Sequence, residues 1–373
     1  MKRGCAAWKY KNENNAMMKQ RSGKTKIIPH SRPTLGQAEI ESVSRVMATS
    51  HIAQGQVVHD FEQAFAEYLG VKSAACTSSG TAALHLVLKA MGIGEQDEVV
   101  IPSYVCTALL NSVEYVGAKP ILAEIDPDTY NLDPEDVKGR LSSRTKAIIV
   151  PHLFGLPADI DGLLALNIPI IEDCAQAVGS TYRRHFTGTF GKAAIFSFYA
   201  TKVMTTGEGG MVISNSKDLI DRVKDLREYD NKDEYLVRYN YKMTDIHAAI
   251  GMVQLERIKT FLRRRRDIAE LYNQAFDSFG LQLPPQNRGH IYYRYVIGLG
   301  TDAEVLAKTL QNQGIGCARP VFLPLHRYLN LKGYYQTENA WEQALSIPIY
   351  PSLSTQDIDR LIDRCTETFR KMA

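Results

Sequence analysis

The chain has 373 residues, of which 45% are hydrophobic and 23% are charged. This composition is typical of a globular protein of about two domains, and it excludes a collagen, a disordered protein and a small disulfide scaffold. The net charge of +3 is uneven, because residues 1–26 carry eight lysines and arginines against one acid, Glu13. The remaining residues carry 36 basic and 40 acidic side chains. We therefore expect a basic, disordered tail at 1–26 and a slightly acidic body that does not bind nucleic acid.

Neither a membrane span nor secretion is expected. No apolar run approaches the roughly 18 residues that a transmembrane helix needs, and residues 1–26 lack the apolar centre of a signal peptide. The six cysteines follow no CxxC or other metal-ligand spacing; they are Cys5, Cys76, Cys106, Cys174, Cys317 and Cys365. We therefore predict a cytoplasmic protein with reduced thiols and no metal site.

After the tail, short apolar segments alternate with helical patterns such as 82–91 and 134–141. Seven segments are expected to be strands: 73–77, 98–101, 119–125, 146–150, 168–172, 193–198 and 210–214. Most are apolar almost throughout, which indicates a sheet that is covered on both faces. The alternation of strands and helices is typical of an α/β domain, which we place at 27–250.

From about Asp245 the pattern changes. Residues 246–276 form a long amphipathic helical pattern, and the arginine run at 263–266 fits a solvated helix face better than a phosphate clamp. Further along the chain we expect strands at 291–298 and 315–321 and helices at 302–314 and 355–372. The sequence therefore predicts a smaller α+β domain at 251–373.

The first chemically suggestive motif is Ser-Ser-Gly-Thr-Ala-Ala-Leu at 78–84, between a predicted strand and a predicted helix. Small residues let backbone amides approach an anion, and a helix N-terminus adds free N–H groups and a favourable dipole. Plain capping of the helix by a serine or threonine explains the same pattern. An anion site and a capped helix both remain open.

The second motif is the acid pair Glu172 and Asp173 at the carboxyl end of the predicted strand 168–172. In α/β sheets this end faces the ligand. A carboxylate there needs a cation, a helix N-terminus or a protonated heterocycle as its partner. A capping aspartate and a functional one fit this pattern equally well.

The third motif is Lys202, which follows the aromatic strand 193–198 and precedes the Gly-rich turn 207–210. Partly apolar surroundings disfavour the charged form of a lysine and leave a nucleophilic free amine. The alternative is a lysine whose chain extends from a strand end to solvent.

Together, the three motifs supply what pyridoxal phosphate requires. The cofactor needs an anion site for its phosphate, a carboxylate that keeps its pyridine nitrogen protonated, and a lysine that holds it as a Schiff base and shuttles protons. The sequence therefore predicts an enzyme that uses this cofactor.

The chain from about residue 28 to its C-terminus also resembles the DegT/DnrJ/EryC1/StrS family of sugar aminotransferases. The matching motifs occur in order at 36–39, 55–62, 79–84, 99–104, 117–120, 172–176, 197–210, 239–249, 324–326 and 347–351. The resemblance implies a fold-type I transferase similar to aspartate aminotransferase. Its large domain would have a mixed seven-stranded sheet between helices, followed by a smaller C-terminal domain.

The resemblance also implies roles for single residues. Lys202 matches the Schiff-base lysine, which also moves the proton between the two imines, and Asp173 matches the partner of the pyridine nitrogen. Gln176 matches a side chain that lies against the cofactor ring and its phenolic oxygen. The phosphate site is matched by four residues: Ser79, Gly80, Thr81 and Ser197.

Asn240 matches an asparagine that reaches the phosphate of the neighbouring subunit's cofactor. The resemblance therefore implies a homodimer with two shared active sites, and twofold symmetry is the commonest form of assembly.

Two positions depart from the family pattern. Cys106 stands where the family usually stacks an aromatic ring on the pyridine, so either Tyr104 compensates or the ring is stacked less. Lys242 stands where the family often has arginine, which keeps the charge and loses the bidentate fork.

The expected reaction moves an amino group from glutamate or glutamine to a keto-sugar linked to a nucleoside diphosphate, with 2-oxoglutarate as the product of glutamate. Candidate substrate contacts are Tyr199, Lys242, Arg319 and His326. A dehydratase or deoxygenase of the same fold is an alternative, but in the deoxygenating relatives histidine replaces the lysine found here at Lys202. A non-catalytic regulatory member is a second alternative, and it would have no reason to keep Lys202, Asp173 and the phosphate site together.

Overall fold

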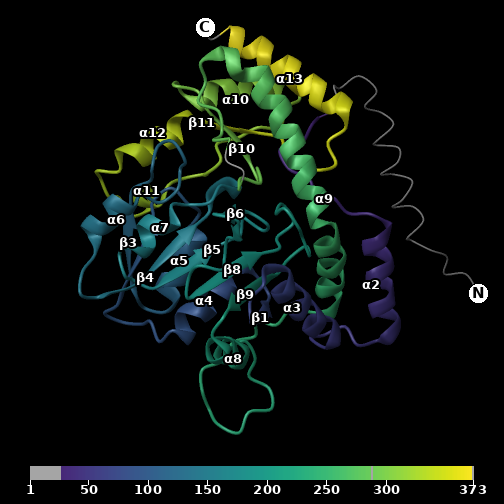
Figure 1. Ribbon diagram of the computed structural model, residues 1–373, viewed down its shortest axis with the longest axis vertical. Helices are drawn as coiled ribbons and strands as arrows, with labels where there is room; N and C mark the ends of the chain where they lie inside the picture. Colours follow the sequence, from purple (N-terminus) through teal and green to yellow (C-terminus); the bar gives the residue numbers. More distant parts are fainter. Residues whose placement is uncertain (1–26, 287–288, 372–373) are drawn as a thin grey trace, which may run out of the picture.

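The computed structural model describes residues 27–286 and 289–371, so the predicted tail at 1–26 lies outside the described residues. Within the described part, seven strands form one sheet in the order β1-β9-β8-β5-β4-β2-β3 (Figure 1). The strands of this sheet are β1 (Ser73–Thr77), β2 (Glu98–Pro102), β3 (Lys119–Ala123), β4 (Thr145–Pro151), β5 (Ile170–Asp173), β8 (Ala193–Ser197) and β9 (Gly210–Ser214). Strand β9 is antiparallel to β1 and β8, and the other pairs are parallel. The prediction of a mixed seven-stranded sheet is confirmed.

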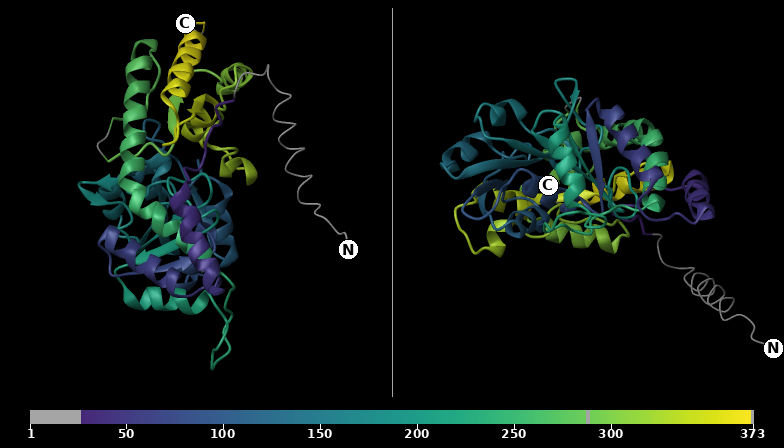
Figure 2. Two further views of the ribbon diagram at one scale, coloured as in Figure 1. Left: turned by 90° about the vertical axis from the view of Figure 1, so that its right-hand side faces the viewer. Right: turned by 90° about the horizontal axis from the view of Figure 1, so that it is seen from below.

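Helices cover both faces of the sheet (Figures 1 and 2). The helices over the described residues are α2 (Gln37–Thr49), α3 (Gln56–Leu69), α4 (Gly80–Ala90), α5 (Thr107–Tyr115), α6 (Pro134–Arg140), α7 (Ile160–Leu164), α8 (Lys217–Leu226), α9 (Asp245–Phe276), α10 (Ala303–Asn312), α11 (Leu325–Tyr328), α12 (Tyr335–Gln343) and α13 (Thr355–Arg370). None of them is long and apolar enough to cross a bilayer.

Successive strand residues pack into different cores, as the pleat of a strand requires. In β1, Ala75 joins the core under α4, α5 and α8, whereas Ala74 and Cys76 join the core under α3 and α9. A further apolar cluster lies between the sheet and helices α6 and α7. The apolar character of the strands therefore follows from burial on both faces.

A second lobe follows along the chain. Strands β10 (Tyr295–Gly298) and β11 (Ala344–Ile347) pair antiparallel, and α10 and α13 pack with them around a separate apolar cluster. The expected strand at 315–321 is wrong. Ile315 pairs with Ile28 and Ala318 pairs with Ser346, so the segment changes partner within three residues and forms isolated bridges only.

Helix α9 runs through both lobes (Figure 1). Its 32 residues extend over about 48 Å. Ile258 and Leu262 pack in the core under α3, and Tyr272 and Phe276 pack in the cluster of the second lobe. This helix continues across residue 250, so no break in the chain marks the domain boundary expected there, and that boundary stays a prediction.

Two short strands lie on the surface between β5 and β8. They are β6 (Thr181–Tyr182) and β7 (His185–Phe186), which pair as a small antiparallel ribbon. This ribbon precedes the residues that surround Glu172.

Candidate active site

The first wall of the site is the junction of β1 and α4. The Ser79 hydroxyl caps α4 by accepting a hydrogen bond from the Ala82 N–H at 3.1 Å. A Cβ atom on Gly80 would lie 2.8 Å from Cβ of Ser197, so the start of α4 and the end of β8 meet at van der Waals distance. Capping and an anion site are therefore compatible, because Ser79 occupies one N–H of the first turn and Gly80 and Thr81 remain half-buried at the helix start.

The two acids at the end of β5 have different environments. Glu172 is fully buried and accepts hydrogen bonds from the backbone N–H groups of Gly188 (2.6 Å), Phe190 (2.8 Å) and Gly191 (2.7 Å). It also contacts Nε2 of His152 at 3.0 Å. Its carboxylate is saturated by the fold, and Glu172 therefore has a structural role.

Asp173 has bonding capacity to spare. It is only 8% exposed, and the one described hydrogen bond to its carboxylate comes from the Ala175 N–H, at 2.9 Å. Burial raises the pKa of this carboxyl, against the opposing effects of the Ala175 N–H, the Lys202 amine and the His152 ring. A cationic partner such as a protonated pyridine nitrogen would offset the cost of burying the charged form.

Lys202 lies in a tight loop after β8. The loop is closed by the bonds Lys202 N–H to Tyr199 O (2.9 Å) and Thr206 N–H to Phe198 O (2.9 Å). The lysine is half-buried, and its amine has no hydrogen-bond acceptor among the described residues. Nζ lies 5.2 Å from the centre of the Tyr293 ring. The amine is therefore held near the end of the sheet without an ion pair that would occupy it.

Gln176 and Cys106 are the two residues predicted to lie against the cofactor ring. The Gln176 side-chain oxygen accepts a hydrogen bond from the Phe154 N–H at 2.8 Å. This bond fixes the orientation of the Gln176 amide, three residues after Asp173 in the chain. Cys106 is exposed at the start of α5. Tyr104 is completely buried, with its hydroxyl 3.3 Å from the Ala340 carbonyl, so it cannot replace the missing aromatic ring.

The four candidate substrate contacts differ in whether other residues of the chain already form ion pairs or hydrogen bonds with their side chains. Lys242 pairs with Asp230 at 2.9 Å, and Arg319 pairs with Asp302 at 2.8 Å. His326 is buried, and both of its ring nitrogens are engaged, by Ser103 at 2.7 Å and by Glu338 at 2.5 Å. Tyr199 is 47% exposed. The described bonds leave Tyr199 the most available of the four.

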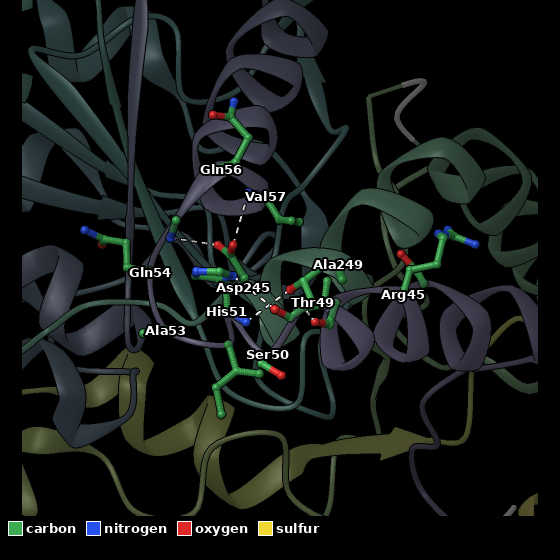
Figure 3. A pocket seen from close by; sticks show the side chains of 14 residues that line it. Arg45, Thr49, Ser50, His51, Ala53, Gln54, Gln56, Val57, Asp245 and Ala249 are labelled. Atoms are coloured by element: carbon green, nitrogen blue, oxygen red, sulfur yellow. Dashed lines mark hydrogen bonds between the residues drawn. The ribbon is translucent and has the colours of Figure 1, made fainter.

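A large groove on the described surface lies away from these groups. It has a volume of about 810 Å³ and runs between α2, the start of α3 and the start of α9 (Figure 3). Asp245 on its floor accepts hydrogen bonds from the Gly55 and Val58 N–H groups, at 2.8 and 3.0 Å. Neither Lys202 nor Asp173 lines it. Its size therefore says nothing about the chemistry of the site.

The amino-acid sequence matches the model of the DegT/DnrJ/EryC1/StrS aminotransferase family over residues 33–366. The chain belongs to this family. Similar relatives include a GDP-perosamine synthase of Caulobacter vibrioides, which is 39% identical over 88% of this chain and 95% of its own length. The GDP-perosamine synthase of Escherichia coli O157:H7 is 35% identical over 92% of this chain and 99% of its own length.

Solved structures of the family have the same fold. The aminotransferase TlmJ from Streptoalloteichus hindustanus superposes with a TM-score of 0.89 at 32% identity, over 93% of this chain and all of its own. A putative sugar aminotransferase from Streptococcus pneumoniae, solved in its PLP form, gives a TM-score of 0.87 at 26% identity, over the same shares of the two chains. The prediction of a fold-type I sugar aminotransferase is confirmed, and the alternatives of a dehydratase and a non-catalytic member receive no support from these names.

As in the rest of the family, the cofactor is pyridoxal phosphate. The chain fits it, because a buried carboxyl with spare bonding capacity, a half-buried amine without an acceptor and a helix start pressed against a strand end occur together. Asp173 would hold the pyridine nitrogen, Lys202 the aldehyde carbon, and the first turn of α4 with Ser197 the phosphate. The assignment of these residues to those roles remains a prediction.

Sequence reasoning missed two neighbours of this site. Tyr293 contacts the Lys202 amine through its ring, and its hydroxyl lies 3.5 Å from that of Thr201. His152 lies beside Glu172 and receives the Ala158 N–H on Nδ1 at 3.1 Å, which fixes the tautomer with its proton on Nε2. His152 comes directly after β4, so the rule that strand ends carry ligands could have identified it, whereas no local pattern indicates Tyr293.

His152, Glu172 and Cys174 bring possible metal-ligating atoms within 4.8 Å of one another. Their bonds have other uses, because both nitrogens of His152 and both oxygens of Glu172 already have partners. Burial also raises the pKa of the Cys174 thiol, which disfavours the thiolate that a metal needs. This cluster therefore stabilises the end of β5 and gives no reason to infer a metal site there.

Proposed function

We propose that the enzyme transfers the amino group of glutamate to a keto-sugar carried on a nucleoside diphosphate, with GDP as the first carrier to test. The observation that carries the transfer is that Lys202 and Asp173 lie near each other at the carboxyl end of the sheet, one with an amine that has no described acceptor and the other with a carboxylate oxygen that has no described donor. The choice of GDP is supported by the names of the two similar synthases.

The roles of the chain's own groups follow from their positions. Asp173 keeps a proton on the pyridine nitrogen, because a buried carboxylate is stabilised by a cation. The Lys202 amine would hold the aldehyde carbon of the cofactor, and as a free base it would take up and return the proton that the amino transfer moves. The cofactor supplies an electron sink for the pair of electrons left on the α-carbon.

A spectroscopic cycle tests this function. Glutamate should bleach the visible band of the purified protein, and 2-oxoglutarate or a GDP-linked keto-sugar should restore it. Lys202→Ala should abolish the cycle, whereas Lys192→Ala, at the surface before β8, should leave it intact. An intact cycle in Lys202→Ala would show that the transfer does not use this lysine. A panel of keto-sugars on different nucleotides then identifies the carrier.

We also propose that the active form is a homodimer in which Asn240 serves the partner's site. Asn240 is exposed and has no described partner, although the Tyr241 carbonyl beside it accepts a hydrogen bond from the Ser78 N–H at 2.7 Å. The loop that follows α8 and leads to Asn240 projects from the body below α8 in Figure 1, and it exposes Tyr235 and Val237. Such exposed apolar side chains are typical of an interface.

Complementation between two inactive variants tests the dimer. A refolded one-to-one mixture of Lys202→Ala and Asn240→Ala should recover about a quarter of the wild-type activity, because half of the dimers are mixed and each mixed dimer has one intact site. A mixture that stays inactive, or a monomer in light scattering, would exclude shared sites. A cytoplasmic location remains part of this proposal, supported by the five free cysteines of the described residues.

A further inference from the structure

Two positive groups share one aromatic ring at the edge of the site. The guanidinium carbon of Arg294 lies 5.1 Å from the centre of the Tyr293 ring, and Nζ of Lys202 lies 5.2 Å from the same centre. Because both are about 5 Å from one point, the two groups can be no more than about 10 Å apart. Arg294 is therefore close enough to meet a molecule that reacts at Lys202.

Arg294 has no anionic partner in the described part of the chain. Its Nη1 faces the ring nitrogens of His30, at 2.7 and 3.1 Å, and its Nε and Nη2 have no described hydrogen bond. Burial, reinforced by the charge of Arg294, lowers the pKa of His30 to about 3, so His30 is neutral at physiological pH. The ring nitrogen at Nε2 is also bound to the Ser346 hydroxyl at 2.8 Å.

The other two cations that the sequence suggested as substrate contacts differ in this respect. Lys242 pairs with Asp230, and Arg319 pairs with Asp302. A partly buried guanidinium without a carboxylate is costly unless an anion from elsewhere completes it. The unpaired charge of Arg294 therefore indicates an anionic ligand.

The backbone around Arg294 is fixed. Its N–H donates to the Phe154 carbonyl at 3.3 Å, and the Phe154 N–H donates to Gln176 at 2.8 Å. From the other side, the buried Arg265 donates to the carbonyls of Tyr292 and Tyr293, at 3.1 and 3.2 Å. Such fixation positions a binding group before the ligand arrives, which reduces the entropy lost on binding.

We propose that Arg294 binds a carboxylate of the amino donor, an inference that rests on the proposed function. The donor's amine must reach the carbon that Lys202 would hold, so its α-carboxylate is necessarily close, and the side-chain carboxylate of glutamate is one short flexible chain away. The planar guanidinium matches a carboxylate with two parallel hydrogen bonds. The diphosphate of the sugar substrate is separated from the reacting carbon by the sugar ring, which makes it the less favoured anion.

Binding of glutarate to the holoenzyme tests the assignment without turnover, because glutarate has both carboxylates of 2-oxoglutarate and no reacting group. Arg294→Met should weaken glutarate binding in calorimetry by roughly tenfold to a hundredfold, as expected for the loss of a charge-assisted bond. Arg294→Lys, which keeps the charge and loses the fork, should fall between this variant and the wild type. In parallel, the KM for glutamate should rise more than kcat falls.

Arg144→Met is the matched control, because Arg144 pairs with Glu98 at the opposite end of β2, and it should bind glutarate like the wild type. The visible cofactor band and the melting temperature show whether each variant is folded and loaded. If Arg294→Met misfolds, Arg294→Lys tests the assignment instead, because its affinity for glutarate should be lower than that of the wild type.

Three results would overturn the assignment: no glutarate binding by the wild type, an affinity of folded Arg294→Met within about twofold of the wild type, or a selective loss of GDP binding. The last would assign Arg294 to the nucleotide. Failure of glutamate to bleach the wild-type band would instead count against the proposed function, while glutarate binding would still decide the role of Arg294.

Discussion

The carboxyl end of the sheet and the segment of α11 and α12 both concentrate charged side chains, but they use them differently. At the end of the sheet, the amine of Lys202 has no described acceptor, and the Asp173 carboxylate accepts one described hydrogen bond. In the segment of α11 and α12, Glu338 accepts from His326 and from Arg327. Polar groups with spare bonding capacity are costly to fold around, so their presence indicates a ligand, whereas saturated groups indicate structure.

The same contrast exists within one strand. Glu172 and Asp173 are neighbours, yet Glu172 has four described partners and Asp173 has one. Adjacent strand residues point to opposite faces, so one carboxyl enters the core and the other faces the site. The following predictions test whether side chains with spare hydrogen-bonding capacity serve the ligand, while fully bonded side chains stabilise the fold.

The largest effect is expected from Asp173→Asn, which keeps the shape and removes the charge. It should lower kcat by roughly 10- to 1,000-fold, because a buried charged partner of the pyridine nitrogen is lost. The melting temperature should change little or rise, since burial of this carboxyl opposes its ionisation. Steady-state kinetics and thermal unfolding measure the two effects.

Glu172→Gln is the matched control. It should lower the melting temperature, because an amide nitrogen would face N–H donors such as those of Gly188 and Gly191. A large loss of kcat at unchanged stability in Glu172→Gln would contradict the distinction between the two acids.

A smaller effect is expected from Gly80→Ala. The added Cβ would lie 2.8 Å from Cβ of Ser197, so the start of α4 and the end of β8 must separate. The Kd for pyridoxal phosphate should rise roughly tenfold, since the phosphate contacts depend on this approach. Gly94→Ala, whose Cβ would meet its nearest neighbour at 3.7 Å, should leave the Kd unchanged.

A spectroscopic effect is expected at Tyr293. Burial raises its pKa, but the charges of Lys202 and Arg294 outweigh this and lower it to about 8. In the cofactor-free protein, one tyrosine should therefore ionise near pH 8 in an ultraviolet titration, and Tyr293→Phe should remove that transition. Lys202→Ala should move it to higher pH. Because the pKa is lower in the folded protein, Tyr293 should add stability as the pH rises from about 8 to about 10.

The smallest effect is expected from Glu338→Gln. Hydrogen bonds from Arg327, and then from His326, lower the pKa of Glu338 to about 2 against the effect of burial. The carboxylate therefore stabilises the fold above its ordinary pKa of 4.5, and this contribution is lost as the pH falls toward 2. The variant should melt roughly 2–4 °C lower at pH 7, with a deficit that shrinks below pH 4.5. A deficit that grows in acid would contradict the ion pair.

Much of the sheet could be predicted, because each strand is apolar on both faces and β1 and β9 have the expected bounds. Asp173 ends β5 and Lys202 comes five residues after β8, so local sequence indicates which end of the sheet they occupy. The Ser103 partner of His326 could not be predicted, because Ser103 lies 223 positions earlier and pairing at such a distance depends on tertiary packing. Tyr293 and Arg294 were missed for the same reason.

The continuity of α9 matters for anyone who exchanges parts between relatives to change sugar preference. A chimaera joined in the loop before Asp245 would separate the Asp245 carboxylate from the N–H groups of α3 that it caps. A junction between Leu262 and Ile268 would divide the helix between the two apolar clusters, but Ile291 and Tyr293 from beyond it pack in the core under α3, and Ile28 from before it packs in the second-lobe cluster. An exchange therefore has to carry these contacting residues along with the part of the helix that they pack against.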